Sequence, residues 1–186
     1  NARYSRKARW NQISPDKAFW LFAFFAVVVF LMGGGSRHDI ASVGPLRFLA
    51  AIVLAIGVFF QTAESFKRIA QPVFMLLLLA ILMIVQLIPL PYSLWSSLPD
   101  REVIVETGEL LGLSGIWRPL TFSPLKTANS LASLIVPLAA LMLLALFDDA
   151  GWSRVRKLVI IAGVASALLG MAQLLLSHAS GLYFYE

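Results

Sequence analysis

The sequence predicts an all-α protein, a polytopic transmembrane helix bundle with about five spans and a short extracytoplasmic surface helix. Two observations support this fold class. Of the 186 residues, 59% are hydrophobic and only 13% are charged, which is more apolar surface than a soluble domain of this length buries in one core. The apolar residues also gather in long runs, and a spanning helix needs roughly 17 to 25 mostly apolar residues.

The apolar runs define five candidate spans, at residues 18–34, 46–61, 73–90, 127–147 and 158–176. The second run is the weakest because its apolar core is short and Arg47 lies at its start. An arginine at a helix end can still extend its charge to the interface. Pro137 interrupts the fourth run and predicts a kink there, because proline cannot donate a helical hydrogen bond.

The basic residues predict the orientation of these spans. Of the fifteen lysines and arginines, ten fall in one alternate set of loops and termini, which includes the basic segment 1–17. The other set holds five, namely Arg37, Arg47, Arg101, Arg118 and Lys126. The positive-inside rule therefore predicts a cytoplasmic amino terminus. The expected units are 1–17 on the cytoplasmic side, spans one to three in 18–90, an outer segment 91–126, and the last two spans in 127–186.

The outer segment is long enough to hold a short helix. Ser97 and Asp100 resemble a capping box, and Gly112 is placed as a helix stop. Between them three glutamates share one helical face, and valine, isoleucine and leucine side chains share the other. This division favours a helix that lies on the membrane surface with solvated carboxylates. The alternative interpretation makes the glutamates catalytic acids or bases.

Several function classes are disfavoured by composition. The net charge of +5 is scattered between apolar runs, so anionic lipid headgroups rather than nucleic acid are the expected counter-charge. The absence of cysteine excludes disulfides, thiol nucleophiles and cysteine-ligated metals. His38 and His178 are far apart in the chain, and no metal site or cofactor is expected. The run GGGSRHD at 33–39 favours a hairpin over a phosphate loop, because it lacks a GK[ST] ending.

A resemblance to a known family begins near Val73. It follows the order QLIPLPYSLWSSLP, WRPLTFSPLKTANSLASLIVPLAALMLL, GMAQLLL and GLYFYE, of which WRPLTFSP is the most specific part. This order resembles the amino-terminal portion of the O-antigen ligase and polysaccharide polymerase family. The resemblance implies a bacterial inner-membrane enzyme with an architecture like that of class-C glycosyltransferases. Such enzymes transfer a glycan from a polyprenyl diphosphate carrier to an acceptor on the periplasmic side, without a metal.

The same resemblance implies which residues are candidates for catalysis and for binding the diphosphate. In the family, the essential basic and histidine residues follow the segment that matches GLYFYE, so the catalytic half is expected to be missing from this sequence and the catalytic residues stay unknown. A diphosphate leaving group favours arginine, whose planar fork binds phosphate oxygens in pairs. The candidates are Arg118, Lys126, Arg47 and Arg37. Arg118 is favoured because Pro119 and Trp117 flank it. Contact with lipid phosphates at helix ends is the competing role for all four.

The fifth span adds a second hypothesis. Ala162, Ser166 and Gly170 form a stripe of small residues that permits close packing with another membrane subunit. The chain is therefore either the amino-terminal part of a lipid-linked glycan ligase or polymerase, or a catalytically inactive structural or assembly subunit derived from that family. A transporter is disfavoured, since the apolar runs contain no acidic residue for ion coupling.

Overall fold

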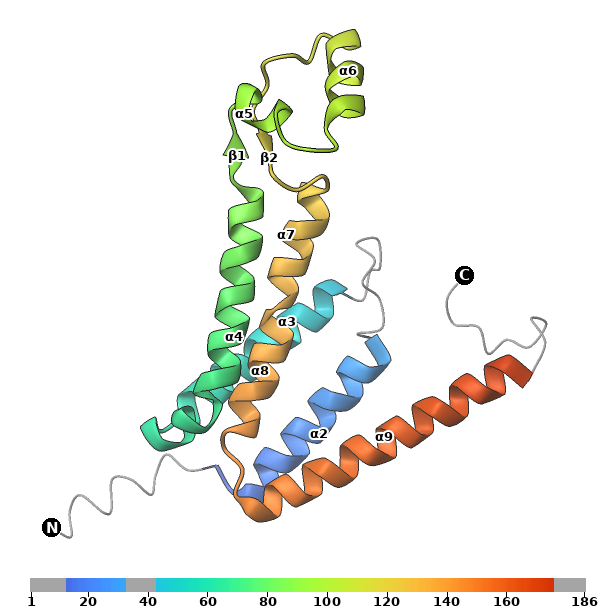
Figure 1. Ribbon diagram of the computed structural model, residues 1–186. Coiled ribbons are helices and arrows are strands. Elements are labelled where there is room, and N and C mark those ends of the chain that lie inside the picture. Colours follow the sequence, from blue (N-terminus) through green and yellow to red (C-terminus); the bar gives the residue numbers. More distant parts are fainter. Residues whose placement is uncertain (1–12, 33–42, 176–186) are drawn as a thin grey trace, which may run out of the picture.

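The structure is a computed structural model that describes residues 13–32 and 43–175 (Figure 1). In these residues five helical segments are long and apolar enough to cross a membrane. They are α2 (Pro15–Met32), α3 (Val43–Phe60), α4 (Ala63–Leu87), α7 (Pro124–Ser133) together with α8 (Ile135–Leu144), and α9 (Asp149–Leu175). The predicted helix bundle with five spans is confirmed. The chain is a multi-pass membrane protein in contact with membrane lipids.

The fourth span is broken at Leu134, between α7 and α8. Pro137 lacks the N–H that would bond to the carbonyl of Ser133 in a continuous helix. The N–H of Leu134 instead bonds to Leu131 O at 3.1 Å, which tightens the last turn of α7. The break therefore lies in the turn before the proline, as the sequence predicts.

The packed core lies where α2, α3 and α8 meet the start of α9. Its most buried large side chains are Phe25, Val53, Leu143 and Phe147. Gly57 permits close approach of α3 and α8, since a Cβ on it would lie 2.8 Å from Met142 Cβ. Between helices in lipid such tight packing replaces the hydrophobic effect as the main source of association.

Among the spans, α4 and α9 are the least buried. Only 6% of the residues in each of these spans are buried, against 22% for α2 and α3. In Figure 1, α4 runs beside α7 and α8, whereas α9 extends away from the other helices after its first turns. Their exposed apolar side chains therefore face hydrocarbon or a further membrane-embedded helix.

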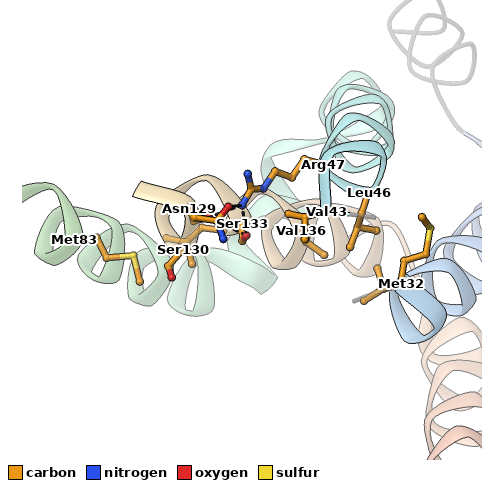
Figure 2. Close-up of a pocket in the computed structure, with 11 residues that line it drawn as sticks. Met32, Val43, Leu46, Arg47, Met83, Asn129, Ser130, Ser133 and Val136 are labelled. Atoms are coloured by element: carbon orange, nitrogen blue, oxygen red, sulfur yellow. Dashed lines mark hydrogen bonds between the residues drawn. The ribbon is translucent and has the colours of Figure 1, made fainter. Parts of the chain in front are cut away.

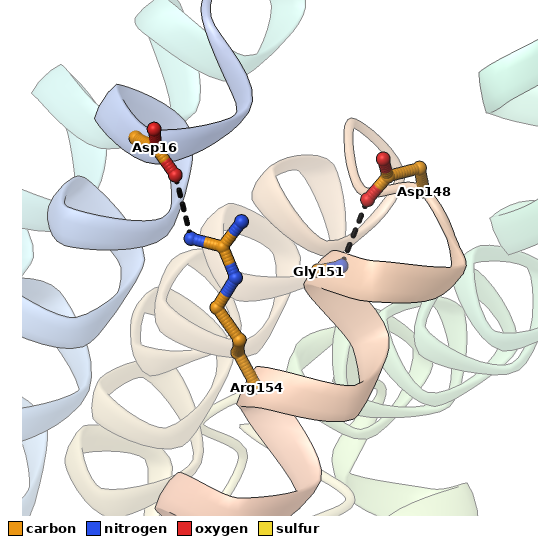
Figure 3. Close-up of polar contacts among 4 residues, drawn as sticks. All are labelled: Asp16, Asp148, Gly151 and Arg154. Atoms are coloured by element: carbon orange, nitrogen blue, oxygen red, sulfur yellow. Dashed lines mark hydrogen bonds and ion pairs between the residues drawn. The ribbon is translucent and has the colours of Figure 1, made fainter.

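All five spans begin before their apolar runs, and α4 and α9 do so by more than two helical turns. α4 starts at Ala63, not at residue 73, because Thr62 and Ser65 form a capping box. α9 starts at Asp149, not at residue 158. Its first turn is capped by Asp148, whose Oδ1 accepts the Gly151 N–H at 2.8 Å (Figure 3). Polar first turns thus extend both helices beyond the hydrocarbon region.

The segment at residues 88–123 forms a compact unit, here called the headpiece. It contains β1 (Pro89–Leu90), α5 (Tyr92–Ser96), α6 (Glu102–Leu110) and β2 (Arg118–Pro119). The two strands pair antiparallel, with Pro89 opposite Pro119. Trp95 Nε1 donates to Pro119 O at 2.9 Å and ties α5 to β2. Figure 1 shows the headpiece beyond the ends of α4 and α7.

For α6, the predicted start is wrong and the predicted end is confirmed. The capping box at Ser97 and Asp100 does not form, because Ser97 Oγ donates to Leu94 O at 2.9 Å and Asp100 has a φ of 61°. Gly112 does end the helix, with a φ of 66°. Its N–H bonds to Glu109 O at 3.1 Å, and Leu113 N–H bonds to Gly108 O at 2.8 Å. This pair of bonds is a Schellman motif.

Candidate functional site

A cavity of about 420 Å³ lies at the junction of α2, α3, α4, α7 and α8. We call it the Arg47 pocket, after its one charged residue among the described lining (Figure 2). Most of its wall is apolar, and apart from Arg47 of α3 the polar part comes from α7. It is lined by Val29, Met32, Val43, Leu46, Arg47, Met83, Asn129, Ser130, Ser133, Leu134 and Val136.

Arg47 is held in place by α7. Its Nη2 donates to Asn129 O at 2.6 Å, to Asn129 Oδ1 at 2.6 Å and to Ser133 Oγ at 2.8 Å. Figure 2 shows the side chain reaching from α3 to these two residues. Because Nη2 has two hydrogens, the three acceptors share them. The guanidinium is therefore fixed in position before any ligand binds.

Local sequence explains this arrangement. Arg47 lies near the start of α3, and Asn129 and Ser133 are four residues apart, which places them on one face of α7. Pro124 begins α7 and presets the backbone angle of its first turn. Ser133 Oγ also donates to Asn129 O at 3.0 Å, so the two acceptors are themselves linked.

The electrostatics of the Arg47 pocket favour an anion. None of the described residues that line it is acidic. Nε of Arg47 is buried without a hydrogen-bond partner, and Nη1 makes no hydrogen bond to the described residues. A cation among apolar walls is costly unless a counter-charge compensates it. An amphiphilic anion would supply both the charge and apolar contact.

Arg118, the favoured candidate from sequence, lies elsewhere. It belongs to β2 in the headpiece, and its Cζ lies 5.1 Å from the centre of the Trp95 ring. Its Nη2 lies against α6, where a Cβ on Gly108 would be only 3.1 Å away. Arg118 lines a smaller cavity of about 220 Å³ with Trp95 and Phe122. The structure therefore does not place Arg118 and Arg47 in one pocket.

The other two candidates take no part in either cavity as described. Lys126 is exposed in the first turn of α7 and forms no hydrogen bond or ion pair with the described residues. Arg37 lies outside the described residues, as do His38 and His178. The glutamates of α6 are exposed, which fits the solvated-face interpretation, and no group of described residues could hold a metal ion.

Sequence reasoning missed Arg101. This arginine is only 5% exposed, and its Cζ lies 3.7 Å from the Phe122 ring centre and 4.7 Å from that of Trp95. Nη2 donates to Leu120 O at 2.5 Å, while Nε and Nη1 are buried without a hydrogen-bond partner among the described residues. No sequence pattern marked it, because its contacts come from across the headpiece. For Asn129 and Ser133 a signal existed, namely polar residues four apart in a spanning helix.

No protein-family model, no curated protein and no solved structure matches the chain. The chemistry around the two cavities is therefore the main indication of function. Of these two cavities, the Arg47 pocket is the stronger candidate for a binding site, because it combines a positioned cation with apolar walls inside the membrane-spanning region.

Proposed function

We propose that this chain is the carrier-binding, amino-terminal part of a membrane glycan ligase or polymerase. It would act on a polyprenyl-diphosphate-linked glycan at the extracytoplasmic face of the bacterial inner membrane. The supporting observation is the Arg47 pocket. A polyprenyl diphosphate joins a multiply charged head to a long apolar tail, and the pocket offers a fixed guanidinium beside apolar walls.

The reaction explains why a fixed cation is useful. Glycan transfer breaks the bond between the sugar and the diphosphate, so negative charge develops on the leaving group. Arg47 is held by its Nη2, which leaves Nη1 to donate to a phosphate oxygen. Donors that are positioned in advance need no reorganisation as the charge develops. The residue that activates the acceptor is not assigned to this chain.

The proposal is tested by carrier binding in lipid nanodiscs. Arg47→Gln should weaken polyprenyl diphosphate binding by roughly tenfold to a hundredfold, the range for hydrogen bonds to charged groups. Binding of the uncharged polyprenol should change much less. Arg156→Gln is the matched control, since Arg156 is exposed in α9 and lines neither cavity. Equal diphosphate affinity in Arg47→Gln and wild type would contradict the proposal.

A second candidate function is a structural or assembly subunit. It is favoured by α9, where a Cβ added to Gly163 or Gly170 would meet no described atom within 4 Å. In the stripe of Ala162, Ser166 and Gly170, Ser166 is exposed and a Cβ on Gly170 would meet no described atom, so this face suits contact with another helix.

The intact mass of the protein purified from its native membrane separates the two functions. A mass about twice the 20.4 kDa of this chain favours the enzyme. A mass near 20.4 kDa, together with a stoichiometric membrane partner, favours the subunit.

A further inference from the structure

A third cavity, of about 310 Å³, lies at the ends of α4 and of the fourth span that are opposite the headpiece (Figure 1). We call it the turn pocket, because the α3–α4 turn and the α8–α9 link form most of it, together with residues at the start of α2. Its polar lining consists of Thr62, Glu64, Ser65 and Arg68 on one side and Asp148 on the other. It shares no described lining residue with the Arg47 pocket.

The turn pocket presents charges of both signs. Glu64, Arg68 and Asp148 are exposed, and none of them forms an ion pair with another described residue. Arg68 is oriented by the hydrogen bond from its Nη1 to Phe147 O at 3.1 Å. One oxygen of Asp148 caps α9 through Gly151. The remaining guanidinium donors, the other Asp148 oxygen and both Glu64 oxygens form no hydrogen bond with the described residues and can contact a ligand.

The depth of the pocket indicates what kind of ligand reaches it. The apolar runs of α4 and α9 start only at residues 73 and 158, whereas the pocket is formed before them, at residues 60–68 and 145–148. Helix ends at this level lie among lipid headgroups. The apolar part of the lining, Ile13, Phe60 and Leu146, can cover a glycerol backbone.

We propose that the turn pocket binds the headgroup of a zwitterionic phospholipid that has a primary ammonium group, as in phosphatidylethanolamine. Arg68 would bind the phosphate, and Glu64 and Asp148 would accept hydrogen bonds from the ammonium. A phosphatidylglycerol headgroup would satisfy Arg68 with its phosphate, but it has no positive charge to offset the two carboxylates. A choline headgroup has no N–H, so it cannot donate to them. Charge and hydrogen bonding together therefore select the ethanolamine class.

Native mass spectrometry of the full chain in detergent tests this selection. Phosphatidylethanolamine, phosphatidylcholine and phosphatidylglycerol with identical acyl chains are added at equal concentration, and bound lipid is counted. We expect the ethanolamine lipid to bind about threefold to tenfold more tightly than either of the others, given charge-assisted hydrogen bonds at an exposed site.

Variants assign the preference to the turn pocket. Glu64→Gln with Asp148→Asn should reduce the ethanolamine preference to less than about twofold; asparagine caps a helix as well as aspartate does, so α9 stays capped. Arg68→Gln should weaken all three lipids. Asp149→Asn and Lys67→Gln are the controls, because both residues are exposed and outside the pocket lining. Circular dichroism verifies that each variant keeps its helices.

Three results would overturn the inference. Equal binding of the ethanolamine and choline lipids would show that the carboxylates do not select an ammonium. Tighter binding of phosphatidylglycerol would assign the pocket to anionic lipid through Arg68 alone. A carbodiimide cross-link between Lys7 and Glu64 in lipid-saturated protein would show that the basic amino-terminal segment, and not a lipid, occupies the pocket.

Discussion

At the scale of single residues, the polar side chains of this protein act mainly by holding arginines. Asn129 and Ser133 fix one end of the Arg47 guanidinium, and two aromatic rings with one carbonyl hold Arg101. Both arginines also keep donors without described partners. A donor without a partner lowers stability when it lies away from water. The effect of a substitution on stability therefore depends on the surroundings of each arginine.

Asn129→Ala should lower the free energy of unfolding by about 1.5 kcal/mol, because it removes a 2.6 Å hydrogen bond to a charged group. Ser130→Ala is the control. Ser130 lines the same pocket but forms no hydrogen bond with Arg47, so its effect should stay within about 0.5 kcal/mol. Denaturation in detergent measures both, and an equal loss in the two variants would contradict the assigned role of Asn129.

Arg101→Met should lower the stability of the headpiece less than Arg101→Ala does. Alanine leaves a cavity against Trp95 and Phe122 and costs about 3 kcal/mol, whereas methionine refills the space and removes the two unpartnered donors. Hydrogen exchange across residues 88–123 measures the local stability. If both variants exchange equally fast, the guanidinium itself is required, and its stacking contributes more than packing alone.

At the scale of elements, length and hydropathy were sufficient to predict the five spans, because lipid permits few ways to satisfy backbone hydrogen bonds. Helix starts were harder to predict. The caps at Thr62 and Asp148 lie among polar residues, which extend the helix without adding to an apolar run. Ser97 looked like a cap, but its hydroxyl is used inside the preceding helix.

The α3–α8 contact offers a test at this scale. Gly57→Ala should lower the free energy of unfolding by about 1–3 kcal/mol, because its Cβ would lie 2.8 Å from Met142 Cβ and would push two backbones apart. Gly163→Ala in α9 is the matched control: its Cβ would meet no described atom within 4 Å, so the change should be neutral or slightly stabilising. Comparable losses in both would disprove the close packing of α3 on α8.

At the scale of the whole molecule, the sequence predicted the candidate site only in part. Arg47 was identified as a cation at the start of a span. Its acceptors lie on another helix, and Asn129 comes 82 positions later in the chain than Arg47. Such pairing depends on how the spans pack, and hydropathy does not encode this. Arg118 was favoured for its neighbours in sequence, yet its guanidinium lies in the headpiece and not in the Arg47 pocket.

The orientation of the whole chain is testable because it contains no cysteine. Ser114→Cys in the headpiece should react with a membrane-impermeant maleimide in intact cells. Ala150→Cys at the start of α9 should react only after permeabilisation. Both positions are exposed, so access depends on the side of the membrane. The opposite labelling pattern would reverse the orientation that the positive-inside rule predicts.

The ion pair between Asp16 and Arg154 joins the first described helix to the last across 138 residues (Figure 3). During synthesis, α2 therefore enters the bilayer long before the arginine that pairs with its first turn exists. At roughly 5–20 residues per second, that wait lasts on the order of ten seconds. In this interval Asp16 lacks its Arg154 partner, and the flank of α2 that α9 later contacts is uncovered. Membrane insertion can thus proceed span by span, whereas closure of the bundle must await the final helix.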